Sequence, residues 1–138
     1  MRVYLAGPMR GIPDFNFPAF HHAAFDLRRQ GYVVFSPAES SHEAEWAAAQ
    51  GPSYDSTLGV AGPQAATLRY FMQVDLPEVL RCDAVAILDG WHQSVGCQIE
   101  TYVAFACGIP VKAYEEGIPL ADAYEFNRYA HPHITRPV

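Results

Sequence analysis

The chain has 138 residues and a mass of 15.3 kDa, which suits a single domain, since domains usually hold ~100–150 residues. Half of the residues are hydrophobic and 17% are charged, a globular composition that excludes a disordered tail or a fibrous repeat. Nine basic and fifteen acidic residues give a net charge of −6, whereas a broad nucleic-acid surface needs clustered positive charge. We therefore expect no nucleic-acid partner.

Neither a membrane anchor nor a disulfide framework is expected. No apolar run approaches the ~20 residues that a membrane-spanning helix needs, and the N-terminus lacks a secretory pattern. The three cysteines are odd in number, contain no C-x-x-C pair and are interpreted as buried small apolar residues: Cys82, Cys97 and Cys107. The sequence thus predicts a cytoplasmic protein with no membrane partner.

Strand-like and helix-like segments alternate along the chain. The expected strands are residues 3–6, 32–35, 84–88 and 109–114, and the expected helices are residues 16–30, 65–82 and 98–107. Asn16 is the expected N-cap of the first helix, and Gly31 is the glycine expected just after its end. This alternation indicates βαβ crossovers. The expected fold class is α/β: one Rossmann-like (flavodoxin-like) domain over residues 1–138, with a parallel sheet and helices on both faces.

The segment 38–64 breaks the pattern. Its periodicity is lost apart from a short helical stretch at residues 43–50, and five Gly or Pro residues interrupt positions 51–63. Trp46 and Tyr54 are aromatic side chains that could stack on a base. We interpret the segment as a mobile lid over a ligand pocket, with these two residues as candidate base contacts. The alternatives are a solvated insertion, or packing of the aromatic side chains on a neighbouring subunit.

Several familiar motifs are absent. The sequence has no G-x-G-x-x-G and no G-x-x-x-x-G-K-[ST], which removes the usual arguments for a dinucleotide site or a P-loop. His42-Glu43 begins like the zinc motif H-E-x-x-H, but Trp46 stands where the second ligand is needed. The other histidines have no partner ligand at suitable spacing. We expect no metal and no cofactor.

Two candidate segments precede the last helix. In open α/β sheets, ligands bind at the carboxyl ends of the strands. After the first strand, glycines flank Arg10, so the backbone can approach a ligand while the guanidinium reaches an anion. A tight turn with a solvated Arg10 is an equal alternative. Asp75 lies on the helix before the buried strand, but Asp75-Leu76-Pro77-Glu78 also fits a capping box in which Pro77 restarts a helix after a break.

The third segment is Ser94-x-Gly96-x-x-x-Glu100. Gly96 permits close approach, Ser94 offers a hydroxyl, and free backbone N–H groups at a helix start favour a phosphate. Glu100 is expected in the first turn of the helix, where the positive helix end favours the ionised carboxylate that a nucleophile needs. The alternative is a surface Glu that only complements the helix dipole.

The order and spacing of these segments resemble the nucleoside 2-deoxyribosyltransferase-like superfamily. Within it, the chain is most similar to the nucleoside 5′-monophosphate N-glycosidases and their small uncharacterised bacterial and phage relatives. The resemblance covers most of residues 2–112. It consists of Tyr4-Leu5-Ala6-Gly7-Pro8-Met9-Arg10-Gly11, Asp75-Leu76, Arg81-Cys82-Asp83-Ala84-Val85, and Ser94-x-Gly96-x-x-x-Glu100 followed by Ala104 and Gly108.

This resemblance implies a role for each matching residue. Glu100 would be the nucleophile that attacks C1′ of the sugar, Tyr4 would orient it, and Asp75 would assist protonation of the leaving base. The residues implied to hold the 5′-phosphate are Gly7, Pro8, Met9, Arg10, Gly11, Ser94 and Gly96. Ser94 matches the monophosphate hydrolases, since the deoxyribosyltransferases usually carry an Asp at this place to meet a free 5′-hydroxyl.

The implied activity is hydrolysis of the N-glycosidic bond of a (deoxy)nucleoside 5′-monophosphate. The products would be the free base and (deoxy)ribose 5-phosphate, formed through a covalent glycosyl-Glu100 intermediate. The resemblance also implies a homodimer or higher homo-oligomer. Two alternatives stay open: a nucleoside 2-deoxyribosyltransferase, in which a second base replaces water, and a nucleotide-binding module without catalysis.

Overall fold

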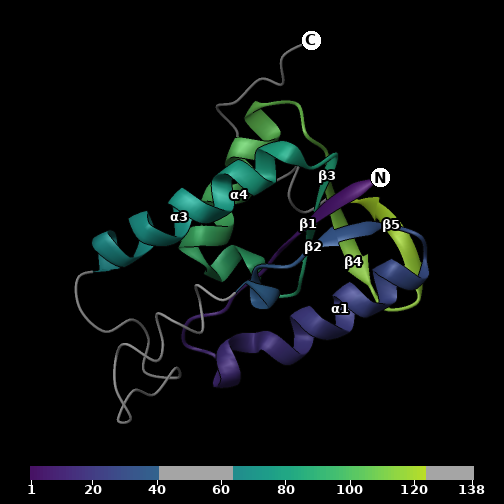
Figure 1. Ribbon diagram of the computed structural model, residues 1–138, viewed down its shortest axis with the longest axis horizontal. Helices are drawn as coiled ribbons and strands as arrows, with labels where there is room; N and C mark the ends of the chain where they lie inside the picture. Colours follow the sequence, from purple (N-terminus) through teal and green to yellow (C-terminus); the bar gives the residue numbers. More distant parts are fainter. Residues whose placement is uncertain (41–63, 124–138) are drawn as a thin grey trace.

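A computed structural model describes residues 1–40 and 64–123, and it confirms the α/β fold class (Figure 1). The strands are β1 (Arg2–Ala6), β2 (Val33–Phe35), β3 (Ala84–Ile87), β4 (Val111–Glu115) and β5 (Ile118–Asp122). The helices are α1 (Phe17–Arg29), α3 (Gln64–Arg81) and α4 (Val95–Ala106), with the short 3₁₀ helices η1 (Pro13–Asn16), η2 (Pro37–Glu39) and η4 (Trp91–Gln93). The expected strands and helices in this part of the chain are all present, within a few residues of their expected bounds.

The five strands form one sheet in the order β2-β1-β3-β4-β5. β1 pairs in parallel with both β2 and β3, and β3 pairs in parallel with β4. The last strand differs from the expected all-parallel sheet because β5 runs antiparallel to β4. The chain reverses between them at Gly117, whose φ of +71° suits a glycine in a tight turn. β5 was not predicted from the sequence.

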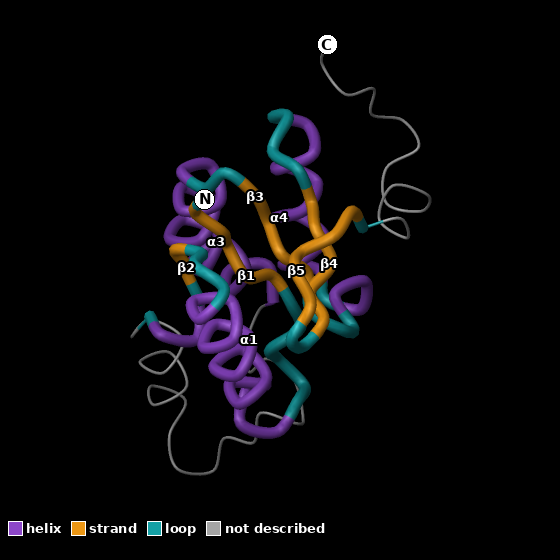
Figure 2. Tube along the Cα trace, turned by 90° about the vertical axis from the view of Figure 1, so that its right-hand side faces the viewer, coloured by secondary structure: helices purple, strands orange, loops and turns teal. Residues whose placement is uncertain are grey.

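Helices cover both faces of the sheet, as expected (Figure 2). On one face, α1 packs on alternate residues of β1 and β3, including Val3, Leu5 and Ala86. On the other face, α3 and α4 pack on the residues in between, including Tyr4 and Val85. Because successive side chains of a strand point to opposite faces, Tyr4 and its neighbours in β1 belong to different cores. β3 is buried along its whole length, as a strand covered on both faces should be.

Helix α1 is bounded much as the sequence predicts, with one difference in its capping. Gly31 follows the helix with a φ of +96°, as expected of a glycine that ends a helix. Asn16 occupies the N-cap position, but its side chain makes no cap hydrogen bond. Its Nδ2 atom instead donates to the carbonyl oxygen of Pro8 at 3.0 Å. Asn16 therefore ties the start of α1 to the loop that follows β1.

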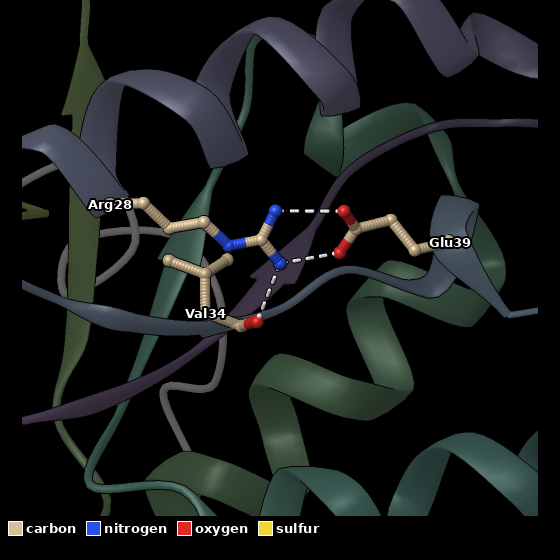
Figure 3. A network of polar contacts seen from close by, with 3 residues as sticks. All are labelled: Arg28, Val34 and Glu39. Atoms are coloured by element: carbon tan, nitrogen blue, oxygen red, sulfur yellow. Dashed lines mark hydrogen bonds and ion pairs between the residues drawn. The ribbon is translucent and has the colours of Figure 1, made fainter.

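The first residues of segment 38–64 are part of the structured domain. Ala38 is buried, and Glu39 accepts two hydrogen bonds from the guanidinium of Arg28, at 2.7 and 2.5 Å (Figure 3). The same guanidinium donates to the carbonyl oxygen of Val34 at 3.0 Å, which joins α1, β2 and η2. Residues 38–40 are thus an anchor rather than a lid. The proposed lid residues 41–63, with Trp46 and Tyr54, lie outside the described residues.

Two further findings concern the cysteines and the helices. Cys82 and Cys97 are buried as predicted, but Cys107 is exposed, which corrects the interpretation of all three as core residues. Cys107 lies at the C-terminal end of α4, directly before Gly108, where the chain turns toward β4. Within residues 1–40 and 64–123, no helix is long and apolar enough to cross a bilayer.

Candidate functional site

A cavity opens at the carboxyl edge of the sheet, between the loop after β1 and the helices α3 and α4. It holds about 360 Å³ of empty space, a volume that includes the part open to solvent. Four side chains with ionic or polar groups line it: Arg10, Asp75, Ser94 and Glu100. The other described lining residues are Leu5, Gly7, Met9, Phe20, Pro37, Phe71, Met72 and Gly96.

Strand β1 supplies the floor of the site and the loop beside it. Tyr4 is 0% exposed, and its ring stacks on Phe35 of β2 with centroids 5.5 Å apart and planes 12° apart. Gly7 packs tightly, since a Cβ atom on it would lie only 2.9 Å from the Cβ of Leu88. The chain then leaves the sheet, and Met9 and Arg10 reach the cavity wall.

Pro8 and Gly11 are not among the described residues that line this cavity. Pro8 packs near Gly90, because a Cβ on that glycine would lie 3.2 Å from the Pro8 Cγ. Its carbonyl oxygen faces Asn16, as described above. Gly11 is exposed and has a φ of +82°, so it serves the turn before η1. The structure therefore gives both residues a loop-shaping place rather than a position on the cavity wall.

Helix α4 starts earlier than predicted, and this changes the position of Glu100. Ser94 is the N-cap residue, and its Oγ atom accepts a hydrogen bond from the Cys97 N–H at 3.2 Å. The helix therefore begins at Val95 instead of residue 98, and Glu100 falls in the second turn rather than the first. Since the effect of the helix dipole fades within the first turn, the positive helix end does not explain an ionised Glu100.

Helix α3 is continuous through Asp75 and Pro77, as the expected helix over residues 65–82 requires, and this excludes the alternative of a capping box with a helix break. Asp75 lies inside the helix and is 3% exposed, facing the cavity rather than capping an N-terminus. Glu100 is likewise buried, at 7% exposed. Charged side chains are seldom buried this deeply without a partner or a function. The surface-Glu alternative is therefore excluded for Glu100.

The buried hydroxyl and thiol next to these carboxyl groups keep their protons. Burial, and then the nearby Glu100 and Asp75 carboxyl groups, raise the pKa of Tyr4 well above its ordinary 10.0. The hydroxyl lies beside Glu100 without the geometry of a regular hydrogen bond to any described residue. Burial, and then Glu100, also raise the pKa of the Cys97 thiol. Tyr4 is thus a hydrogen-bond donor here, and Cys97 is not a thiolate nucleophile.

Arg10 brings a positive charge to the same cavity. Its guanidinium carbon lies over the ring of Phe71, 3.8 Å from the ring centroid. The ring of Phe71 belongs to α3, one helical turn before Asp75, so both residues face the cavity from one side of that helix. The Nε and Nη2 atoms of Arg10 are buried.

The structure brings most of the predicted site residues together. Seven of them line the cavity: Gly7, Met9, Arg10, Asp75, Ser94, Gly96 and Glu100. Tyr4 lies next to it, close enough to Glu100 and Asp75 for their charges to act on its hydroxyl. Phe71 and Met72 also line the cavity but were not predicted from the sequence. The available signal was their spacing on α3, since Phe71 precedes Asp75 by four residues and therefore shares its helix face.

Residues 1–113 match a family described as Domain of unknown function (DUF4406). The chain belongs to this family. Its matched region runs from the start of the chain into β4, so it includes every described residue of the candidate site. A comparison with curated proteins finds no match.

Membership in the DUF4406 family establishes a shared domain but assigns no activity, so the chemistry rests on the cavity itself. Within residues 1–40 and 64–123, no three His, Cys, Asp or Glu side chains lie close enough together to hold a metal ion. What does come together there is a pair of buried carboxyl groups, a protonated tyrosine and one guanidinium. This group can bind an anion and move protons.

Proposed function

We propose that this protein is a nucleoside 5′-monophosphate N-glycosidase, which hydrolyses the bond between the base and the sugar. The observation that carries the proposal is the burial of Asp75 and Glu100 in one cavity, with Tyr4 beside them. The sequence resemblance described above supports it independently, because it assigns chemistry to these same three residues.

Cleavage of an N-glycosidic bond passes through an oxocarbenium-like transition state, as in retaining glycosidases. In the proposed mechanism, a Glu100 oxygen attacks C1′ while the bond from C1′ to the base nitrogen breaks. The bonding electron pair leaves with the base, which takes a proton from Asp75, directly or through a water. Water then attacks C1′, returns a proton to Asp75 and releases (deoxy)ribose 5-phosphate. The Glu100 carboxylate is regenerated.

The hydroxyl of Tyr4 has a separate task in this mechanism. Since its pKa is raised, it stays protonated and can donate a hydrogen bond to a Glu100 oxygen. That hydrogen bond would hold the carboxylate in one orientation for attack on C1′. It would also stabilise the carboxylate as it leaves in the second step, when the glycosyl ester breaks.

We assign the phosphate to the part of the cavity lined by Arg10, Ser94 and Gly96. Arg10 can form a forked pair of hydrogen bonds with phosphate oxygens. Ser94 and Gly96 stand at the start of α4, where unpaired N–H groups favour an anion. A carboxylate at position 94 would repel a phosphate, so a serine there favours the phosphorylated substrate over the free nucleoside.

The test is incubation of the full chain with a panel of ribo- and deoxyribonucleoside 5′-monophosphates, modified pyrimidines included, with chromatography for released base. The matching unphosphorylated nucleosides are the control. We expect free base and (deoxy)ribose 5-phosphate from at least one monophosphate, and much less release from its nucleoside. Exchange with an added second base would instead indicate a deoxyribosyltransferase. Tight binding of a monophosphate without release would indicate a binding module.

A further inference from the structure

We infer that Phe71 is a positioning residue for anion recognition: its ring holds the Arg10 guanidinium in place to receive a phosphate ester. The inference rests on the proposed function for the identity of the substrate. Its physical basis is the stacked contact between Arg10 and Phe71, with the guanidinium carbon 3.8 Å from the ring centroid.

Arg10 needs such support because of where it sits in the chain. It belongs to the loop between β1 and η1, outside any helix or strand, and Gly11 follows it with a positive φ. An arginine on such a loop has many rotamers, and ordering it only when the ligand arrives weakens binding. A stack that fixes the side chain beforehand removes that cost from the binding step.

The ring is well suited to this role. Phe71 is 1% exposed and belongs to the long helix α3, so its position is set by the helix rather than by the loop. Tyr70 contacts it edge-on, with centroids 5.1 Å apart and planes 68° apart. A ring face attracts a guanidinium placed over it, while the N–H groups of the guanidinium point outward in its own plane. The stack therefore leaves those N–H groups directed away from the ring.

The test is a double-mutant cycle with phosphate-ester binding as its readout. Phe71→Met keeps an apolar side chain but removes the ring face, Phe71→Tyr keeps the ring, and Arg10→Ala removes the guanidinium. Binding of ribose 5-phosphate, with ribose as the matched neutral probe, is measured by calorimetry for each variant and for Phe71→Met with Arg10→Ala. The control is Phe25→Met, which removes the ring under Arg29 on the exposed face of α1, where the guanidinium carbon is 5.8 Å from the ring centroid.

We expect Phe71→Met to weaken ribose 5-phosphate binding by about 3- to 30-fold, the range that a cation–π contact supports, with Phe71→Tyr close to the parent. In the Arg10→Ala background, Phe71→Met should have no further effect. Equal losses with and without Arg10, or an unchanged affinity in Phe71→Met, would overturn the inference. This readout needs no turnover. The protein could therefore release no base while the variants change ribose 5-phosphate binding as expected. That result would count against the proposed activity and not against the role of Phe71.

Discussion

Gly96 lies one helical turn before Glu100 on α4, and a Cβ atom placed on it would be 3.9 Å from the Oε1 atom of Glu100. Both residues line the cavity. A side chain at position 96 would therefore begin within contact distance of the Glu100 carboxylate. The two glycines of the site differ in this respect, since a Cβ on Gly7 would clash with Leu88 whereas a Cβ on Gly96 would make only ordinary van der Waals contacts.

Gly96→Ala should reduce activity without reducing stability. The new methyl group would lie 3.6 Å from Met72 Cε and 3.7 Å from Leu68 Cδ1, which are ordinary contact distances. Alanine favours helix over glycine by up to about 1 kcal/mol, so the free energy of unfolding should be equal or higher. Base release should fall about tenfold or more, because crowding a bound ligand by about 1–3 kcal/mol has that effect.

Gly7→Ala is the comparison variant for Gly96→Ala. Its Cβ would lie 2.9 Å from Leu88 Cβ, so the strand end must shift, at a cost of about 1–3 kcal/mol in the free energy of unfolding. Urea unfolding of both variants measures the difference. A loss of stability in Gly96→Ala as large as that in Gly7→Ala would show that Gly96 is needed for packing and not for ligand access.

Ser94→Asp should change substrate preference while preserving the helix. Aspartate caps a helix about as well as serine, so α4 should keep its start. The added charge should lower kcat/KM for the monophosphate by about 10- to 1,000-fold more than for the nucleoside, since like charges at ~4 Å repel by about 1–4 kcal/mol. Ser94→Asn supplies a neutral cap as the control. Equal losses on both substrates in Ser94→Asp would place the phosphate elsewhere.

Asp75→Asn should lower kcat by about 10²–10⁴-fold and change KM little, because it removes a general acid and keeps the shape of the side chain. For a substrate whose leaving group needs no proton, such as a nitrophenyl glycoside 5-phosphate, Asp75→Asn should lower kcat much less. Steady-state kinetics on the two substrates gives the comparison. Equal losses on both would contradict proton donation by Asp75 and point to a role in substrate shape.

Glu39→Gln tests the anchor of residues 38–40. Hydrogen bonds from Arg28 lower the pKa of Glu39 below its ordinary 4.5, against the smaller opposing effect of burial. A lowered pKa means that the ion pair stabilises the fold above pH ~4.5 and that this contribution is lost as the pH falls through the lowered value. The two side chains are 43% and 40% exposed, so water screens the pair and about 0.2–1 kcal/mol is expected at pH 7.

The stability difference between the parent and Glu39→Gln should therefore shrink when thermal unfolding is repeated at decreasing pH below 4.5. Lys112→Met, which removes a surface pair with Asp122 elsewhere in the sheet, is a control for loss of any exposed ion pair. If the stability difference between the parent and Glu39→Gln grew toward low pH, the pKa of Glu39 would not be lowered in the folded protein.

Strands and helices with regular patterns were predictable, and irregular ones were not. The continuous apolar run of β3 and the glycine after α1 indicated their structures directly. β5 gave no such signal, since its residues are largely exposed and include Pro119, which is tolerated only at a sheet edge. Its position depends on distant contacts, such as the hydrogen bond from the Gly117 N–H to Asp26 at 2.8 Å.

Most of the predicted site residues lie at one cavity, but the local structure around two of them differs from the expectation. The sequence around Asp75 looks like a capping box because Pro77 usually marks a helix start, and only tertiary packing shows the helix running through it. The start of α4 was placed too late because Val95 and Gly96 are poor helix formers, although Ser94 was already a good N-cap. The stack of Arg10 on Phe71 joins distant parts of the chain and leaves no local pattern.

In the proposed mechanism the Glu100 carboxylate performs the chemistry, and base release by Glu100→Gln measures its contribution. The amide has the same shape but cannot act as a carboxylate nucleophile. We predict that turnover of the best monophosphate falls by about 10³-fold or more, while the thermal midpoint and ribose 5-phosphate affinity stay near those of the parent. Glu100→Gln that releases base at more than about a tenth of the parental rate would contradict the mechanism, since loss of a nucleophile costs far more than this.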